Sequence, residues 1–396
     1  MAGFLCLSRV RHNSPGRSLS AGNHLICWPC EEAIIVLVAL FLLPYVIETS
    51  VAAKVRPHNR VERTFATQAE LPSISLIVPT YNEEKNIDTK LQNLFEQSYP
   101  KERMEIIVVD SSTDSTPRKV GAWMDRVPNI RLVTEPQRMG LAHALNLGYS
   151  AARGDIVIKS DCDILYDEDS VSNIVMNFAD PKVGAVSGRQ KLRSGNDVES
   201  GYRELLNKKR RLETRFGSAY IVDPFCAFRK SLVEKIYERS ASDDAELAIK
   251  IRKKGFYSIF DENAVFYEQT PKSKLERLKQ KQRRAQGHIQ LHLQQRSILL
   301  KRDLGIFSSL IFPATFWTVV LNPWLLLTVI MLAFGEILSF GLSPVALTTL
   351  LGLCVGLVSY LLGKPKYLAG FFESQMALLV GWFVLILKGP SYMWTK

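Results

Sequence analysis

The chain has 396 residues, enough for two modules, since single domains usually run to roughly 100 to 200 residues. Apolar residues make up 47% and charged residues 22%, and the mean hydropathy is +0.02, which excludes a disordered or fibrous chain and is high for a fully soluble one. The net charge of +11 suits anionic partners, namely phosphorylated small molecules, anionic lipid or nucleic acid. Six cysteines are too few for a disulfide framework.

Apolar residues gather in four stretches near the two ends of the chain. Each stretch is long enough to cross a membrane as a helix, which takes about 20 residues. Two of them hold a single acid, Glu48 and Glu373. The stretch at 304–335 exceeds one span and contains Pro313 and Pro323, so we predict an interfacial segment that turns into one span. The four stretches are residues 33–53, 304–335, 337–363 and 367–387.

The chain is therefore predicted to be a soluble domain framed by membrane helices. A signal peptide is the alternative for the first stretch, but 30 residues precede its apolar part and Glu31 and Glu32 adjoin it, which disfavours this reading. If the stretch at 304–335 crosses the membrane once, the loop Lys364-Pro365-Lys366 lies on the same membrane face as the soluble domain. The positive-inside rule favours this arrangement if that face is cytoplasmic. The predicted order is a tail over 1–32, a transmembrane helix over 33–53, the soluble domain over 54–271, a basic interfacial helix over 272–303 and about three transmembrane helices over 304–388.

The soluble domain alternates short apolar runs with helical patterns. Alternation of this length predicts an α/β domain whose parallel strands are covered on both faces. Ligands of such sheets bind beyond the carboxyl ends of the strands. The expected strands are 74–79, 105–110, 130–133 and 155–159, and the expected helices are 87–95 and 141–152.

Acids follow two of these strands. Asp110 ends one apolar run, and Asp161 with Asp163 ends another in Ser160-Asp161-Cys162-Asp163. Two carboxylates one residue apart can both turn toward a hard divalent cation and leave coordination positions for phosphate oxygens. The alternative is that these aspartates only cap the next helix, and the neighbouring motifs disfavour it.

Three more motifs accompany this pair in chain order. They are residues 79–84 (PTYNEE), 110–114 (DSSTD) and 140–146 (GLAHALN). With 161–163 (DCD) they resemble the nucleotide-sugar-binding domain of family 2 inverting glycosyltransferases. The match runs through roughly 72–190 and more loosely to about 290. It implies the GT-A fold, a Rossmann-like mixed sheet, here with transmembrane helices as in polyprenyl-phosphate sugar transferases and cellulose- or hyaluronan-synthase-like enzymes.

The resemblance also implies the role of each motif in binding a nucleotide-diphosphate sugar. Pro79, Tyr81 and Glu83 would line the nucleoside pocket, and Asp110 would hold the base or ribose. Ser111 stands where the family often has a second acid, so the donor base stays open between uridine and guanosine.

The DCD motif has a metal-binding role by the same resemblance. Asp161 and Asp163 would hold Mg²⁺ or Mn²⁺ at the diphosphate of the donor. Such a cation compensates the negative charge of the leaving group.

A later acidic element lies at 242–247 (SDDAEL) and precedes a helical pattern. It resembles the family's Glu-Asp-x-Asp-Leu element, with Asp243 in place of the glutamate and Glu246 in place of the last aspartate. The resemblance makes Asp244 the general base, beside Asp243, because an inverting transfer needs a carboxylate for the acceptor. The alternative is an acidic helix N-terminus stabilised by the helix dipole.

Residues 280–287 (QKQRRAQG) are similar to the Gln-x-x-Arg-Trp region of membrane-bound polysaccharide synthases. The resemblance implies that Gln280 faces the donor. Arginine can bind a departing diphosphate bidentately, so Arg283 or Arg284 would serve the leaving group. Arg284 replaces the tryptophan that the family links to acceptor-chain binding, which disfavours processive polymerisation.

Two basic segments remain. Residues 272–302 carry ten Lys or Arg and one acid directly before a membrane stretch, which indicates an interfacial helix rather than a nucleic-acid surface. Residues 202–216 lie where family members place the acceptor, and a solvated basic face is equally compatible with them. Cys27 and Cys30 have redox spacing, but no thioredoxin-like pattern surrounds them.

These observations predict a metal-dependent, membrane-bound glycosyltransferase that uses a UDP- or GDP-sugar and a lipid-linked or glycan acceptor. The enzyme would sit in the cell membrane with its catalytic domain in the cytoplasm. The alternatives are a processive polysaccharide synthase and, outside enzymes, a non-catalytic membrane scaffold that keeps a nucleotide-binding fold. The sequence leaves the oligomeric state open.

Overall fold

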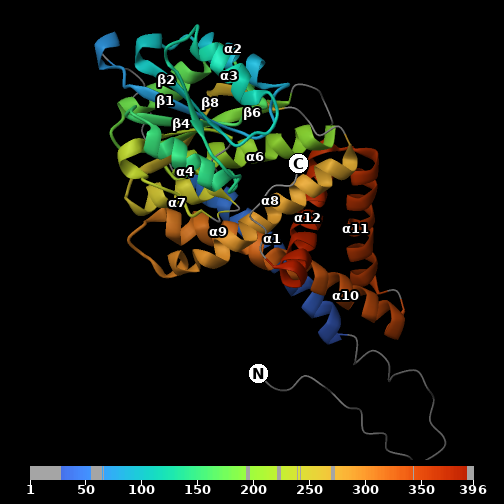
Figure 1. The fold of residues 1–396 in the computed structure, drawn as a ribbon. Coiled ribbons are helices and arrows are strands. Elements are labelled where there is room, and N and C mark those ends of the chain that lie inside the picture. Colours follow the sequence, from blue (N-terminus) through green and yellow to red (C-terminus); the bar gives the residue numbers. More distant parts are fainter. Residues whose placement is uncertain are drawn as a thin grey trace, which may run out of the picture.

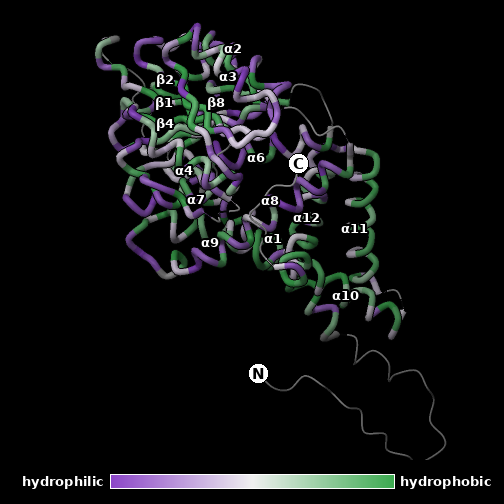
Figure 2. The backbone as a smooth tube through the Cα atoms, in the orientation of Figure 1, coloured by the Kyte–Doolittle hydropathy of each residue, from purple (hydrophilic) through white to green (hydrophobic). Residues whose placement is uncertain are grey.

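The computed structural model describes residues 28–54, 65, 67–192, 197–220, 224–238, 240, 242–268, 273–341 and 343–389. An α/β domain lies against a set of long helices, with the sheet at one side and α1, α10, α11 and α12 at the other (Figure 1). The long helices are hydrophobic along most of their length, whereas hydrophilic and hydrophobic residues mix in the domain (Figure 2). This division agrees with the hydropathy of the sequence.

One eight-stranded sheet forms the domain, in the order β3-β2-β1-β4-β7-β6-β8-β5. The strands expected from the apolar runs form a parallel block. The sheet as a whole is mixed, as the GT-A resemblance implied, because β7 runs antiparallel between β4 and β6, and β5 runs antiparallel to β8. The strands are β1 (Ile74–Thr80), β2 (Met104–Asp110), β3 (Ile130–Thr134), β4 (Ile156–Ser160), β5 (Ile164–Tyr166), β6 (Val183–Leu192), β7 (Phe225–Arg229) and β8 (Tyr257–Glu268).

Helices cover both faces of the sheet because its central strands are apolar on both faces. In β1, Leu76 and Val78 point to one buried cluster and Ile77 points to the other. α2 (Ile87–Phe95), α3 (Thr116–Met124) and α5 (Ser170–Met176) cover the first face. α4 (Leu141–Ala151) and α7 (Asp243–Lys253) cover the second face.

The chain order reverses between β1 and β4. From β1 the chain moves outward to β2 and β3, and it returns to place β4 on the other side of β1. A crevice at such a switch point, beyond the carboxyl ends of the strands, is where α/β sheets bind ligands. The loops at residues 81–84 and 161–163 follow β1 and β4 at this point.

Four helices in the described part of the chain are long and apolar enough to cross a membrane, namely Cys30–Val51, Phe307–Ser339, Pro344–Leu362 and Lys366–Lys388. They fall on the four apolar stretches. The helices within them are α1 (Trp28–Lys54), α9 (Phe312–Phe316), α10 (Asn322–Phe340), α11 (Pro344–Leu362) and α12 (Lys366–Lys388).

The second span is one continuous helical segment with two widened turns. The π-helical turns Phe307–Ile311 and Trp317–Leu321 come just before Pro313 and Pro323. Proline lacks the N–H that would bond to the preceding turn, so the regular ladder is interrupted there. The prolines therefore widen the helix without ending it.

Two further helices join the domain to the membrane helices. They are α6 (Asp197–Thr214) and α8 (Lys274–Gln294), and α8 crosses in front of the membrane helices in Figure 1. α6 meets α12 at two glycines: a Cβ on Gly201 would overlap the carbonyl of Lys366, and one on Gly370 would lie 2.9 Å from the amide nitrogen of Tyr202. The start of α12 therefore lies against α6 of the α/β domain.

Candidate active site

The loops after β1 and β2 are hydrogen-bonded to each other. The backbone N–H of Asn82 donates to Ser112 Oγ at 2.7 Å, and the N–H of Thr113 donates to Asn82 Oδ1 at 2.9 Å. Asn82 adopts a positive φ of 55°, a conformation that asparagine tolerates better than most residues. These contacts join the PTYNEE and DSSTD motifs to each other beyond the carboxyl ends of β1 and β2.

Asp110 is buried at the base of this side. Its Oδ1 accepts hydrogen bonds from Thr80 Oγ1 at 2.7 Å and Ser112 Oγ at 2.6 Å. Both predicted nucleoside motifs thus meet at this carboxylate. The ring of Tyr81 lies under the guanidinium of Arg138, 3.9 Å from the ring centroid, and Pro79 is half-buried at the end of β1. Arg138 was not expected in the pocket.

Asp163 lies near the switch point, within the electrostatic influence of three other carboxylates. Asp163 keeps an exposed edge, yet the surrounding protein raises its pKa to about 7, first by removing water and then through the charges of Asp161, Glu268 and Glu83. Burial likewise raises the pKa of Asp161, whose Oδ1 is buried without a hydrogen-bond partner. Asp161 and Asp163, with one unpartnered oxygen, fit two ligands of a divalent cation; the described residues hold no group of three such ligands, so donor phosphates would have to complete the coordination.

A buried lysine supports the DCD loop from beneath. The Nζ atom of Lys90 on α2 donates to the carbonyl of Ile164 at 2.8 Å and lies 4.1 Å from the ring centroid of Tyr166. Burial lowers its pKa to about 7, although the charges of Asp161 and Asp163 oppose that change. Lys90 was not anticipated from the sequence.

The two acids at the start of α7 share one cation. Lys159 Nζ contacts Asp243 Oδ2 at 2.5 Å and also contacts Asp244 Oδ1. Lys159 belongs to β4, two residues before Asp161, so the acid pair lies beside the DCD loop. The structure thus places the predicted base near the predicted metal ligand Asp161, whose charge acts on it.

The surroundings shift the pKa values of the two acids in opposite directions. Burial and the charge of Asp243 raise the pKa of Asp244 well above its usual range. Burial also acts on Asp243, but the charge and hydrogen bond of Lys159 outweigh it and lower the pKa of Asp243. Asp244 is therefore the better proton acceptor of the pair.

The sequence did carry a signal for Lys159. It directly follows the apolar run Ile156-Val157-Ile158 within β4, and its side chain is only 3% exposed. A lysine in a buried strand needs an acidic partner, because an unpaired buried charge is strongly unfavourable. That rule predicts an acid pair against β4.

Replacing Lys159 should destabilise the protein strongly. Lys159→Met leaves two adjacent carboxylates without their cation, and breaking such a buried pair costs about 3 kcal/mol or more. We expect the apparent Tm of the purified chain to fall by at least about 5 °C. The matched control is Lys119→Met, which breaks the exposed pair with Asp88 and should shift the Tm by less than about 2 °C. Equal shifts in a thermal unfolding assay would contradict the assignment.

α8 brings the predicted leaving-group cations near the same acids. Arg284 Nη2 contacts Glu268 Oε1 at 3.0 Å. Burial and the charge of Arg284 lower the pKa of Arg283 to about 10, against the charges of Asp161 and Asp243. Gln280 lies half-buried one turn before Arg284 on the same helix.

The structure changes the interpretation of the two basic segments. Arg203 and Arg210 on α6 are buried, whereas Lys208 and Arg211 are exposed, so only part of this basic segment is solvated. Three cations of α8, namely Arg277, Lys281 and Arg284, pair with acids inside the protein. Cys27 lies outside the described residues, and Cys30 is a free cysteine in α1.

Comparisons with known proteins agree with this geometry. The family model described as Glycosyl transferase family 2 matches residues 75–237. The chain superposes on the mannosyltransferase PcManGT from Pyrobaculum calidifontis, solved in complex with GDP-Man and Mn²⁺, with a TM-score of 0.76 and 28% identity. That superposition covers 90% of this chain and 99% of the mannosyltransferase, membrane helices of this chain included.

Two curated relatives point the same way. A probable glycosyltransferase, YdaM of Bacillus subtilis (strain 168), is 29% identical over 334 residues, 78% of this chain and 75% of the relative. The poly-beta-1,6-N-acetyl-D-glucosamine synthase of Staphylococcus aureus (strain COL) is 26% identical over 275 residues, 67% of this chain and 65% of the synthase. Residues 75–237 thus match a family 2 glycosyltransferase domain, and the chain combines a GT-A-like mixed sheet with four candidate membrane helices.

Proposed function

We propose that this enzyme transfers one sugar from a nucleotide-diphosphate sugar, with inversion, to a lipid-linked acceptor. The mannosyltransferase that it resembles over most of its length was solved with GDP-Man, so GDP-mannose is the first donor to test. UDP-sugars remain candidates, because Ser111 stands where the family often has a second acid, and this difference leaves the nucleobase of the donor open.

In the proposed site, Asp161 and Asp163 hold Mg²⁺ or Mn²⁺ together with the donor diphosphate. The orphaned Oδ1 of Asp161 and the raised pKa of Asp163 support a cation there. When bound, the metal would neutralise charge that develops on the diphosphate. Tyr81 and Asp110 would hold the nucleoside.

Asp244 would act on the acceptor. It receives the proton of the acceptor oxygen while that oxygen forms a bond to the anomeric carbon and the bond from that carbon to the diphosphate breaks. The nucleoside diphosphate leaves with the negative charge, and Arg283 and Arg284 would stabilise it. Lys159 contacts Asp244 at the start of α7 and would fix its orientation for this step.

The position of α7 carries the proposal of a lipid-linked acceptor. Ala245 and Ile249 of α7 belong to the same buried cluster as Phe307, Ile311 and Phe312 at the start of the second membrane span. The proposed base, Asp244, therefore lies one residue from the contact between the catalytic domain and the membrane region. An acceptor held in the bilayer would meet the base there.

We also propose that the catalytic domain faces the cytoplasm at the cell membrane. Nucleotide sugars are made in the cytoplasm, and the basic loop Lys364-Pro365-Lys366 contacts α6 of the catalytic domain, as the positive-inside rule favours for a cytoplasmic loop.

A donor and product assay tests the proposal. The purified chain, with Mn²⁺ and membrane lipid, is given radiolabelled GDP-mannose and a set of UDP-sugars. We expect metal-dependent release of nucleoside diphosphate and a lipid-extractable product that carries one sugar. A long polymer would support the processive synthase instead. Absence of release with every donor would support the non-catalytic scaffold.

A further inference from the structure

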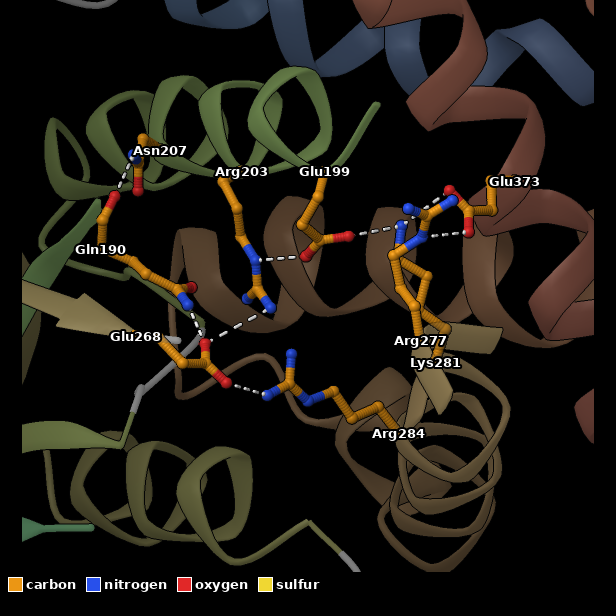
Figure 3. A network of polar contacts seen from close by, with 9 residues as sticks. All are labelled: Gln190, Glu199, Arg203, Asn207, Glu268, Arg277, Lys281, Arg284 and Glu373. Carbon is orange, nitrogen blue, oxygen red and sulfur yellow. Dashed lines mark hydrogen bonds and ion pairs between the residues drawn. The ribbon is translucent and has the colours of Figure 1, made fainter. Parts of the chain in front are cut away.

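The membrane helix α12 carries one buried acid, and two cations of α8 bind it. Glu373 is 2% exposed. Its Oε1 lies 3.0 Å from Arg277 Nε and its Oε2 lies 3.1 Å from Lys281 Nζ (Figure 3). An acid inside a membrane helix is costly unless it is paired, and here both oxygens are paired.

The same ion pairs continue into the catalytic domain. Lys281 Nζ also lies 2.9 Å from Glu199 Oε2, and Glu199 Oε1 accepts from Arg203 Nε at 2.7 Å. Arg203 Nη2 lies 3.5 Å from Glu268 Oε2, whose Oε1 contacts Arg284 at 3.0 Å. Figure 3 shows these side chains converging from α6, α8, α12 and β8. We call this set the junction network: Glu199, Arg203, Glu268, Arg277, Lys281, Arg284 and Glu373.

Stability alone does not account for the junction network. Buried ion pairs gain little net stability over apolar residues of similar size, because removing charges from water is expensive. Burial raises the pKa of Glu199, but Arg203 and Lys281 outweigh it and hold that pKa at about 2, so the acid stays ionised. What such a network does provide is a defined geometry for the helices that it joins.

The network ends at groups of the donor site. The charge of Glu268 acts on both Asp161 and Asp163, the proposed metal ligands. Gln190 Nε2 donates to Glu268 Oε2, so this carboxylate is held from the sheet as well. Arg277, Lys281 and Arg284 are spaced four and three residues apart, which places them on one face of α8.

We propose that Glu373 is a positioning residue that orients Arg284, through the junction network, toward the departing diphosphate. This inference rests on the proposed function. Glu373 touches neither donor nor acceptor. It fixes the rotation of α8 from the membrane side, and Glu268 fixes Arg284 from the sheet side. Without α12, the orientation of Arg284 would therefore be less well defined.

The first test is Glu373→Gln in the full-length chain. The charge is lost while the size stays, and Arg284 serves the transition state more than the bound donor. We therefore expect kcat to fall about tenfold or more and the donor KM to change less than about threefold. Glu336→Gln is the matched control. Glu336 is also an acid of a membrane helix and is 2% exposed, but both of its oxygens lack a hydrogen-bond partner among the described residues, so kcat should not change.

A double-mutant cycle tests whether Glu373 acts on Arg284 through the junction network. Glu373 and Arg284 do not contact each other, so Glu373→Gln and Arg284→Gln should have independent effects unless the network couples them. We expect the double variant to lose little more kcat than Arg284→Gln alone. If Glu373→Gln does not fold, Glu373→Asp, which keeps the charge and shortens the side chain, replaces it in the cycle. Additive losses, or a Glu336→Gln effect of equal size, would overturn the proposal.

The same cycle measured on apparent Tm separates this inference from the proposed function. If the wild-type chain turned over no nucleotide sugar, the proposed function would fail by itself. Non-additive Tm shifts for Glu373→Gln and Arg284→Gln would then still demonstrate the coupling, and additive Tm shifts would refute it.

Discussion

Asp244→Asn should reduce sugar transfer by about 10²- to 10⁴-fold and leave donor affinity nearly unchanged. This is the contribution that a general base typically makes, and the amide cannot accept the proton. Lys159 still has Asp243 as its partner in this variant, so the fold should survive. Initial rates and the Kd of the nucleoside diphosphate, measured on the same preparation, check both halves of the expectation.

Asp243→Asn is the matched control for this variant. Asp243 contacts the same lysine but has a lowered pKa, so it is the weaker base and its replacement should cost less activity. The raised pKa of Asp244 also predicts that transfer declines on acidification at a pH above the usual aspartate range, because the protonated form cannot accept a proton. If Asp243→Asn were the damaging change and Asp244→Asn were harmless, the assignment of the base would be off by one residue.

Asp163→Asn should lower metal-dependent donor binding and reduce kcat/KM by at least about 100-fold. A metal that compensates the diphosphate charge stabilises the transition state by several kcal/mol. Each 1.4 kcal/mol of that stabilisation corresponds to about a tenfold change in the rate constant. Calorimetric titration of nucleoside diphosphate with and without Mn²⁺ measures the loss directly. The wild-type enzyme should likewise lose activity in a chelator and regain it on addition of Mn²⁺.

Asp169→Asn controls for a change of charge near the DCD loop. Asp169 is an exposed acid that makes no side-chain cap at the start of α5, so neither binding nor turnover should respond. Unchanged activity of Asp163→Asn, or activity that a chelator does not reduce, would remove the metal from the proposed mechanism.

The central part of the fold could be predicted from local pattern. The expected helix at 87–95 coincides with α2, and the apolar runs at 74–79 and 105–110 lie within β1 and β2. These elements have strong periodicity and polar residues at both ends, which is where sequence patterns are most reliable. The DCD motif also lies beyond its predicted strand, as expected.

The contacts between distant segments could not be predicted in this way. Glu268 reaches the metal site from the end of β8, and its partner Arg284 was expected to meet only the donor. Glu373 was noted only as a charge within an apolar stretch. Pairing of this kind depends on how helices cross in three dimensions, and periodicity along one helix carries no information on its partner.

The contact between α6 and α12 has a consequence for mutational scanning of this chain. Gly201 and Gly370 lie where a methyl group would strike the backbone of the opposite helix. Larger residues at either position should abolish activity in an activity-based screen, as substitutions of Asp244 would, although neither glycine is placed in the proposed site. Such a screen would score all three positions alike, and only the amount of folded protein would separate them: low for the glycine variants and normal for Asp244→Asn.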